Sequence, residues 1–249
     1  MMNKNINFEV TGRGPKALIF IHGWLGNLRW WDDQVKDFSD QFQVVVMDLP
    51  GHGKSKKSDV GYSSTVYAEA IKEVASQLNA QEIILIGHSM AGAYILEAAA
   101  GIPKTKSLIL VDTLKNLDQH PSIEVAEQMT FTQLRADFRN AVENVLPKYL
   151  FSPSTPISVQ RRLISEFLEA EVEEAISLLA PLYRMDVKSF AQNTTLPVTA
   201  INSTTPPTNK DVNEKYFSNY HLMEANATGH YPMLENPLEF NALLRSVLS

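Results

Sequence analysis

A serine flanked by small residues follows an apolar run in this sequence. Residues 83–86 read Ile-Ile-Leu-Ile, and residues 87–92 read Gly-His-Ser-Met-Ala-Gly. Bulky side chains clash where a strand reverses sharply into a helix, so this pattern is typical of a nucleophile on a strand-to-helix turn. The Oγ of Ser89 would project into a cleft, at the positive end of the following helix. An ordinary strand and helix joined by a small-residue turn is the alternative interpretation.

A histidine in a glycine-containing loop near the carboxyl end has the setting of a general base. Residues 228–232 read Thr-Gly-His-Tyr-Pro, after the last predicted strand and before the last predicted helix. A neutral imidazole can accept the serine hydroxyl proton and later return it to the leaving group. We therefore predict that His230 is the base. The other histidines lack this setting: His22 and His88 border the expected cleft, His52 lies in a turn-rich loop, and His120 and His221 have no supporting context.

The end of an early predicted strand, at residues 22–24, offers donors for an oxyanion. It reads His-Gly-Trp. A loop at this position can donate a backbone N–H to a developing oxyanion, and Gly23 lets the chain approach a substrate closely. We predict that the main-chain N–H groups of Trp24 and Met90 form this oxyanion site. A plain turn at the end of a strand is the alternative.

One aspartate closes an apolar strand-like run. Residues 107–111 read Ser-Leu-Ile-Leu-Val, and Asp112 follows them. A carboxylate after four consecutive apolar residues is costly to bury unless it is paired or hydrogen-bonded. Accepting the Nδ1–H of His230 would satisfy Asp112, fix the tautomer of the histidine and stabilise an imidazolium. In the alternatives, Asp112 caps the segment that follows it, or Asp211 supplies the acid.

Apolar strand-like runs alternate with helical patterns over most of the chain. The strand runs are continuously apolar, which implies burial on both faces and hence a mostly parallel sheet covered by helices, an α/β fold. Strands are predicted at 6–11, 17–22, 43–48, 83–86, 107–112, 196–201 and 220–225. Helices are predicted at 30–39, 64–79, 90–101 and 237–248.

The strand rhythm stops in the middle of the chain and then resumes. Amphipathic helical patterns cover 122–146 and 158–180, with three prolines between them. The acidic run at 169–174 is interpreted as a solvated helix face. We predict two units: a core formed by 1–113 and 191–249, and a helical insertion at 114–190.

Four motifs give the chain a family resemblance. They are Ile21-His22-Gly23-Trp24, Asp48-Leu49-Pro50-Gly51-His52-Gly53-Lys54-Ser55, Gly87-His88-Ser89-Met90-Ala91-Gly92 and Gly229-His230-Tyr231-Pro232. In type and in order they resemble the motifs of the α/β-hydrolase fold family, and they span nearly the whole chain. The resemblance implies an α/β-hydrolase fold, a serine hydrolase activity, and a helical cap at about 114–190.

The sequence departs from the family pattern at two places. Ala91 stands where the family's Gly-x-Ser-x-Gly motif usually ends in glycine, and alanine is small enough for the turn to survive. The family usually places an aspartate in the loop after the strand at 196–201, but residues 202–210 contain no carboxylate. A family alternative puts the acid at the end of the preceding strand, where Asp112 stands. Asp211 comes later and is assigned to the next helix.

Composition narrows the partners and the chemistry. The 249 residues carry a formal net charge of −6, which argues against nucleic acid as the main partner. The chain has no cysteine, which excludes disulfides, thiolate catalysis and Cys-ligated zinc. No His, Asp and Glu cluster has metal-ligand spacing, so neither a metal nor another cofactor is expected. No signal-like or membrane-spanning stretch is found, so a cytoplasmic protein without a membrane partner is expected.

These features together predict an enzyme. The best interpretation is a cofactor-independent serine hydrolase that cleaves a small-molecule acyl substrate, an ester or thioester, through an acyl-enzyme. The alternatives are C–C bond hydrolysis or acyl transfer by the same triad, and a ligand-binding protein without turnover. Apolar residues of the insertion that could line a substrate pocket are Met129, Phe131, Phe138, Leu146, Phe151 and Tyr183.

Overall fold

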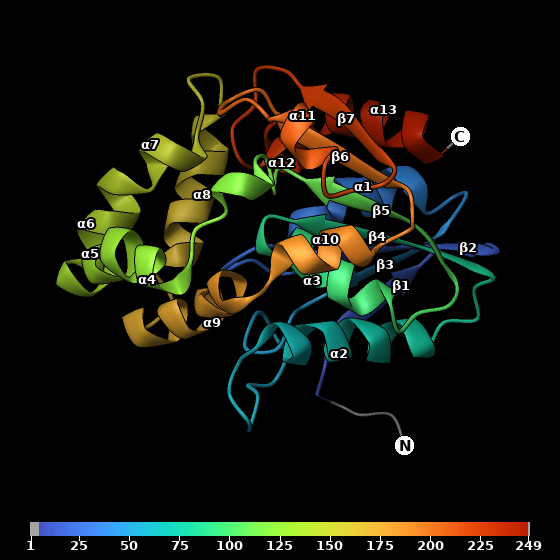
Figure 1. Ribbon diagram of the computed structural model, residues 1–249, viewed down its shortest axis with the longest axis horizontal. Coiled ribbons are helices and arrows are strands. Elements are labelled where there is room, and N and C mark those ends of the chain that lie inside the picture. Colours follow the sequence, from blue (N-terminus) through green and yellow to red (C-terminus); the bar gives the residue numbers. More distant parts are fainter. Residues whose placement is uncertain (1–4, 249) are drawn as a thin grey trace.

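The computed structural model describes residues 5–248 and is built around a seven-stranded sheet (Figure 1). The strand order is β1-β3-β2-β4-β5-β6-β7, and only β1 runs antiparallel, against β3. The predicted α/β fold with a mostly parallel sheet is confirmed. The strands are β1 (Phe8–Thr11), β2 (Lys16–Ile21), β3 (Gln43–Met47), β4 (Glu82–His88), β5 (Thr105–Val111), β6 (Val198–Ser203) and β7 (Tyr220–Ala225).

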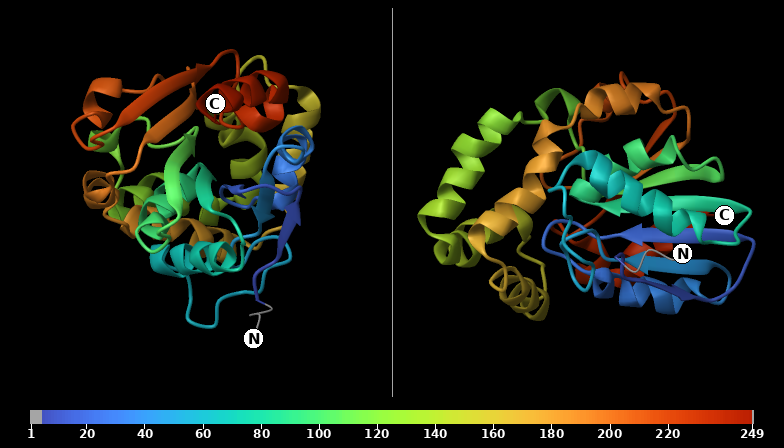
Figure 2. Two further views of the ribbon diagram at one scale, coloured as in Figure 1. Left: turned by 90° about the vertical axis from the view of Figure 1, so that its right-hand side faces the viewer. Right: turned by 90° about the horizontal axis from the view of Figure 1, so that it is seen from below.

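Both faces of the sheet are buried, which explains why its strands are continuously apolar. Along β2, Ile19 and Ile21 pack on one face, whereas Leu18 and Phe20 pack on the other. Figure 2 shows helices on both faces. One face carries α2 (Ser64–Ser76), α3 (Met90–Ala99) and α10 (Val187–Asn193). The other carries the 3-10 helix η1 (Leu28–Trp31), α1 (Asp32–Phe38) and α13 (Pro237–Leu248).

Between β5 and β6 the chain is helical. Most of these helices lie together at one end of the sheet, on the left in Figure 1, whereas α10 covers the sheet itself. We call residues 114–190 the helical segment. It holds η2 (Leu117–Gln119), α4 (Ile123–Ala126), η3 (Glu127–Phe131), α5 (Thr132–Ala136), α6 (Phe138–Asn140), η4 (Ala141–Val145), α7 (Pro147–Leu150), α8 (Ile157–Phe167), α9 (Val172–Arg184) and the first part of α10. Its treatment as a domain separate from the core stays a prediction.

The two long helical patterns of this segment are interrupted, contrary to expectation. Asp137 is extended (φ −159°, ψ 90°), and its side chain accepts the main-chain N–H of Asn140, so one helix ends there and another begins. The second pattern is broken between α8 and α9, so residues 169–171 of the acidic run lie outside a helix. Hydrophobic periodicity does not register such capping breaks, because the apolar spacing continues across them.

Two short helices follow the last two strands: α11 (Lys210–Asn213) comes after β6, and α12 (Pro232–Glu235) comes after β7. The predicted core extends to residues 1 and 249, and residues 1–4 and 249 lie outside the described part. Among the described helices, none has the length and apolar character needed to cross a membrane.

Candidate active site

Ser89 lies where β4 turns into α3. Its backbone has φ 55° and ψ −125°, a conformation with positive φ that L-residues rarely adopt. Residues in such conformations cluster at functional sites. Small neighbours are needed at this turn. A Cβ on Gly87 would lie 2.6 Å from the carbonyl oxygen of Ala91, and one on Gly92 would lie 2.3 Å from Thr113 Cγ2. Ala91 is fully buried, so its methyl group fits where the family usually has glycine.

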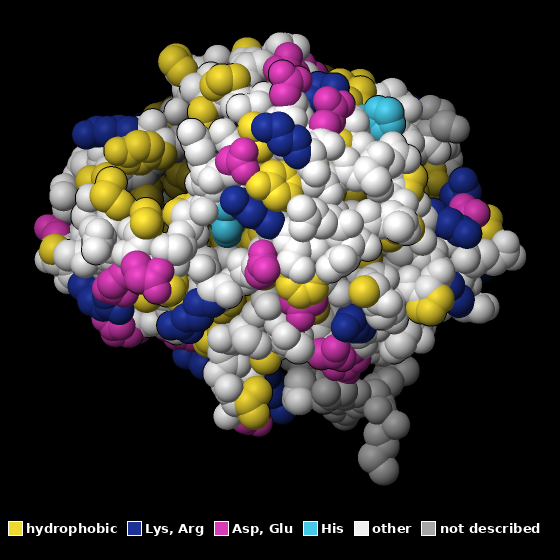
Figure 3. Space-filling view, in the orientation of Figure 1, with side chains coloured by type: hydrophobic (Ala, Val, Ile, Leu, Met, Phe, Trp, Pro, Cys, Tyr) yellow, Lys and Arg dark blue, Asp and Glu magenta, His cyan; other side chains and the backbone are white. Residues whose placement is uncertain are grey.

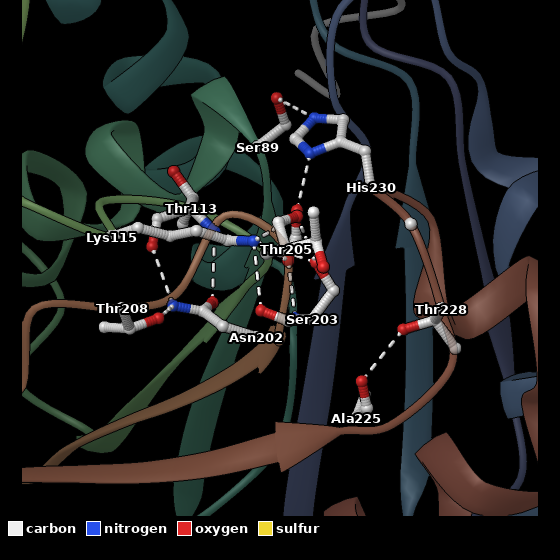
Figure 4. Close-up of polar contacts among 12 residues, drawn as sticks. Ser89, Thr113, Lys115, Asn202, Ser203, Thr205, Thr208, Ala225, Thr228 and His230 are labelled. Carbon is white, nitrogen blue, oxygen red and sulfur yellow. Dashed lines mark hydrogen bonds and ion pairs between the residues drawn. The ribbon is translucent and has the colours of Figure 1, made fainter. Parts of the chain in front are cut away.

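Three side chains from distant parts of the sequence form one hydrogen-bonded chain (Figure 4). His230 lies in the loop between β7 and α12, with its Nε2 2.9 Å from Ser89 Oγ and its Nδ1 2.7 Å from Asp112 Oδ2. Because a carboxylate only accepts, Nδ1–H donates to Asp112 and Nε2 is left to accept the Ser89 hydroxyl. The structure therefore brings together the predicted nucleophile, base and acid. Asp211, the alternative acid, is exposed on α11 and makes no such contact.

Both carboxylate oxygens of Asp112 have partners that favour its ionised form. It is only 4% exposed and has a positive φ of 44°. Its Oδ1 accepts the main-chain N–H of Ser203 at 2.6 Å and lies 2.9 Å from Lys115 Nζ. Burial raises the pKa of Asp112, but the hydrogen bond from His230 and the charge of Lys115 outweigh burial, and its pKa is lowered to about 2. A buried carboxylate with this support stays ionised at neutral pH.

His88, the residue before Ser89, supports the backbone of His230. It is buried, and its Nε2–H donates to the main-chain carbonyl of His230 at 2.7 Å. Burial lowers the pKa of His88 to about 3, so it stays neutral at physiological pH. The expectation that His88 borders the cleft agrees with the structure, where its ring also packs 4.8 Å from that of His230.

Glu235 fastens the loop that carries His230. Its Oε2 accepts the main-chain N–H of Gly229 at 2.7 Å and the hydroxyl of Thr155 at 2.5 Å. Its Oε1 accepts the N–H of Tyr231 at 3.0 Å. Sequence reasoning missed Glu235, because charged residues are usually exposed and no local pattern marks this one as buried. The carboxylate therefore joins both flanks of His230 to the helical segment.

Gly23 brings the loop after β2 against Ser89. A Cβ at this glycine would lie 2.9 Å from Ser89 Cβ and 2.7 Å from His88 Nδ1. The adjacent Trp24 borders the same cavity as Ser89, and its indole N–H donates to the carbonyl of Ala175 on α9. The N–H of Met90 belongs to the first turn of α3, where amides have no acceptor within the helix. The oxyanion role of Trp24 and Met90 stays a prediction.

A cavity of about 460 Å³ opens at Ser89 and His230 and runs under the helical segment. Figure 3 shows hydrophobic side chains gathered around a hollow over this part of the molecule, at the left of the view. Of the residues predicted to line a pocket, Met129, Leu146 and Tyr183 do so, and the other three do not. Those three pack into the hydrophobic core instead: Phe131, Phe138 and Phe151.

A second cavity, of about 600 Å³, also borders His230. It shares Tyr149, Leu182, Tyr183 and His230 with the first, and it adds a polar wall that includes Lys115 and His120. Ser89 borders only the first cavity, whereas His230 borders both. Within residues 5–248, no three His, Asp or Glu side chains are grouped as metal ligands would be.

Comparison with known families decides the identity of this fold. The family model described as alpha/beta hydrolase fold matches residues 16–153, more than half of the chain. The chain belongs to the α/β-hydrolase fold family. The resemblance of its motifs is thereby confirmed.

Solved α/β-hydrolases share the whole architecture. An esterase from Exiguobacterium antarcticum superimposes with a TM-score of 0.85 and 21% identity, covering 98% of this chain and 96% of that one. In sequence, a pimeloyl-[acyl-carrier protein] methyl ester esterase from Stenotrophomonas maltophilia is 30% identical over 146 residues. That match covers 57% of this chain and 54% of the esterase.

Other curated relatives match over a shorter region. An uncharacterized protein from Mycobacterium tuberculosis is 33% identical over 105 residues, which is 42% of this chain and 30% of that protein. The chain thus spans about a third to a half of the length of these curated relatives. Esterases and other hydrolases recur among the relatives and the structural neighbours of this α/β-hydrolase.

Proposed function

We propose that this α/β-hydrolase is a serine hydrolase that cleaves an ester or thioester without a cofactor, through an acyl-enzyme. The observation that carries the proposal is the hydrogen-bonded chain from Ser89 through His230 to Asp112, at the mouth of an apolar cavity. A serine is activated when its hydroxyl donates to a base that a third group orients, and the two distances lie within that range.

In the acylation step, Ser89 Oγ attacks the substrate carbonyl carbon while His230 Nε2 takes its proton. The tetrahedral oxyanion is held by the N–H groups of Trp24 and Met90. The imidazolium, stabilised by Asp112, then gives the proton to the leaving group as its bond to carbon breaks. Water then repeats the sequence on the acyl-enzyme: its oxygen attacks the acyl carbon while His230 Nε2 takes its proton. The imidazolium returns that proton to Ser89 Oγ as the bond between Oγ and the acyl carbon breaks, and the carboxylic acid leaves.

The two cavities support an assignment of the two halves of the substrate. The acyl group is attached to Ser89, so it occupies the largely apolar cavity that Ser89 borders. The leaving group receives its proton from His230, so it extends towards the second cavity, which His230 borders and Ser89 does not. The helical segment covers the acyl side as a cap. An acyl chain of small to medium length fits a cavity of about 460 Å³.

The proposal is tested by labelling with a fluorophosphonate, which reacts with an activated serine, and by a series of p-nitrophenyl esters of graded acyl length. We expect the native chain to be labelled at Ser89 and to hydrolyse the esters with an optimum chain length. Ser89→Ala should abolish both. Leu179→Trp, which adds bulk in the apolar cavity, should move the optimum to shorter chains. A native chain that is never labelled and cleaves no ester would falsify the proposal and favour a ligand-binding protein.

A further inference from the structure

Lys115 lies almost buried against the carboxylate of Asp112. Its Nζ is 2.9 Å from Asp112 Oδ1, and the two side chains are 12% and 3% exposed. The ammonium also donates to Ser203 Oγ at 2.8 Å and to the carbonyls of Ser203 and Thr205 at 3.1 and 3.2 Å. Figure 4 shows this side chain reaching Ser203 and Thr205. A lysine is rarely buried without a partner, and here the partner is the carboxylate that His230 contacts.

The ammonium of Lys115 has no hydrogen to spare for a ligand. It carries three donors, and four acceptors already surround it. Although Lys115 borders the second cavity, its contacts are therefore directed away from a substrate anion and into the protein. Its action is on Asp112 and on the loop after β6, the place where the family more commonly carries its own acid.

The backbone around Lys115 is built to hold this arrangement. Asp112 and Leu114 both have positive φ angles, 44° and 47°. The side chain of Asn202, at the end of β6, accepts the N–H of Thr113 and donates to its carbonyl. The carbonyl of Lys115 accepts the N–H of Asn209 at 2.7 Å. The turn after β5 is thus fastened to the segment after β6, with Asp112 and Lys115 facing each other.

We propose that Lys115 is a positioning residue of the Ser89–His230–Asp112 site. It fixes Oδ1 of Asp112 so that Oδ2 faces His230, and its charge partly offsets that of Asp112 where the imidazolium forms. The inference rests on the proposed serine hydrolase function. It has an electrostatic consequence, because the charge of Lys115 lies against the carboxylate that faces His230.

Several other titratable groups surround the Ser89–His230–Asp112 site. Burial lowers the pKa of His88 to about 3 and also lowers that of His120, so both are neutral at pH 7. Glu235 faces the His230 loop from α12 and adds a second carboxylate. Three tyrosines complete the surroundings: Tyr149, Tyr183 and Tyr231. Among the residues named here, Lys115 is thus the one whose positive charge lies against the site.

The test measures the rate of fluorophosphonate labelling against pH, so that no natural substrate is needed. In Lys115→Met we expect labelling at neutral pH to fall about tenfold or more. In the plot of labelling rate against pH, the midpoint of the acid limb, the rise on the acidic side, should move to higher pH by about half a unit to one unit. A shift of this size is expected when a unit charge a few ångströms away is removed from a partly screened site. Lys115→Arg keeps the charge and should keep the native midpoint, even where its larger head group slows labelling.

Lys210→Met is the matched control, because it removes the same charge from the exposed, neighbouring α11. It should leave both the rate and the midpoint unchanged. Thermal unfolding of each variant identifies those that are not folded at the assay temperature. A folded Lys115→Met with the native acid limb would overturn the proposal, and so would a Lys115→Arg whose acid limb follows that of Lys115→Met. Failure of the native chain to be labelled would instead overturn the proposed function.

Discussion

His88 donates its Nε2–H to the main-chain carbonyl of His230 across 2.7 Å. The residue before the proposed nucleophile therefore holds the residue that accepts its proton. The contact links the end of β4 to the loop after β7, two segments that are far apart in sequence. Because the side chain of His230 also contacts Ser89 and Asp112, its backbone and its ring are fixed by separate groups.

Replacing this donor should reduce turnover more than binding. In His88→Phe an aromatic ring is kept, but the partly buried carbonyl of His230 loses its partner, and the loop shifts to recover a hydrogen bond. We expect kcat on p-nitrophenyl esters to fall about tenfold to a hundredfold, with KM within a factor of about three. His221→Gln, on the exposed face of β7, is the control and should behave as the native chain. A His88→Phe enzyme with native kcat would contradict this role.

Asp112 and Asp211 can be separated by paired substitutions. Asp112→Asn keeps the shape of the side chain but removes the anion that holds the Nδ1–H tautomer of His230. We expect kcat to fall about a thousandfold or more in this variant. Asp211→Asn, on the exposed surface of α11, should keep native kcat. Steady-state kinetics on one p-nitrophenyl ester compares them, and near-normal turnover by Asp112→Asn would exclude it as the acid.

Three buried histidines should make the protein lose stability in mild acid. Burial lowers the pKa of His22 to about 4, and that of His52 and His88 to about 3, from a usual value of 6.5. The unfolded chain therefore binds protons at these side chains below pH 6.5, whereas the folded chain binds them only near pH 3 to 4. Proton binding favours the unfolded state in this window, so the free energy of unfolding falls with falling pH.

The size of this effect can be measured by urea unfolding. Each histidine should contribute on the order of 2 kcal/mol of lost stability between pH 7 and pH 5. His52→Leu removes one of the three and should reduce the slope of stability against pH by about a third, whatever its stability at pH 7. His221→Gln replaces an exposed histidine and should leave the slope unchanged. An equal slope in His52→Leu and the native chain would show that burial of this histidine is not the cause.

Local sequence patterns predicted the sheet and the three side chains that meet at its edge. Ser89 and Asp112 each directly follow a strand that contains a run of four apolar residues, and parallel strands place their carboxyl ends together. His230 follows the last strand for the same reason. These residues were found because each is marked by its immediate neighbours.

The groups that support the site leave no comparable mark. Lys115 and Glu235 contact partners that are about 80 to 90 residues away, such as Ser203 and Thr155. Neither side chain belongs to a period of apolar residues, and charged residues are usually exposed, so pattern alone assigns both to the surface. Their roles follow only from tertiary packing.

Glu235 should matter for both stability and turnover, because it joins the His230 loop to the helical segment. Its two oxygens accept the N–H groups of Gly229 and Tyr231, and one of them also accepts the hydroxyl of Thr155. In Glu235→Gln one oxygen is replaced by an NH2 group, which donates and so faces a main-chain donor. A buried donor without an acceptor costs about 1–3 kcal/mol.

We therefore expect Glu235→Gln to lower the free energy of unfolding by about that amount. We also expect kcat to fall about tenfold, because the loop no longer holds His230 in its position beside Ser89. Glu239→Gln is the matched control. Its carboxylate also accepts a main-chain N–H, that of Asn226, but at the exposed surface, where water can replace it. Thr155→Val removes the hydroxyl that joins Glu235 to the helical segment, and with it the hydrogen bond that this hydroxyl accepts from the main-chain N–H of Ser152. If turnover depends on the hydrogen bonds from Gly229 and Tyr231 to Glu235, Thr155→Val should lose some stability and keep most of its kcat. A loss of kcat equal to that of Glu235→Gln would instead assign the effect to the helical segment.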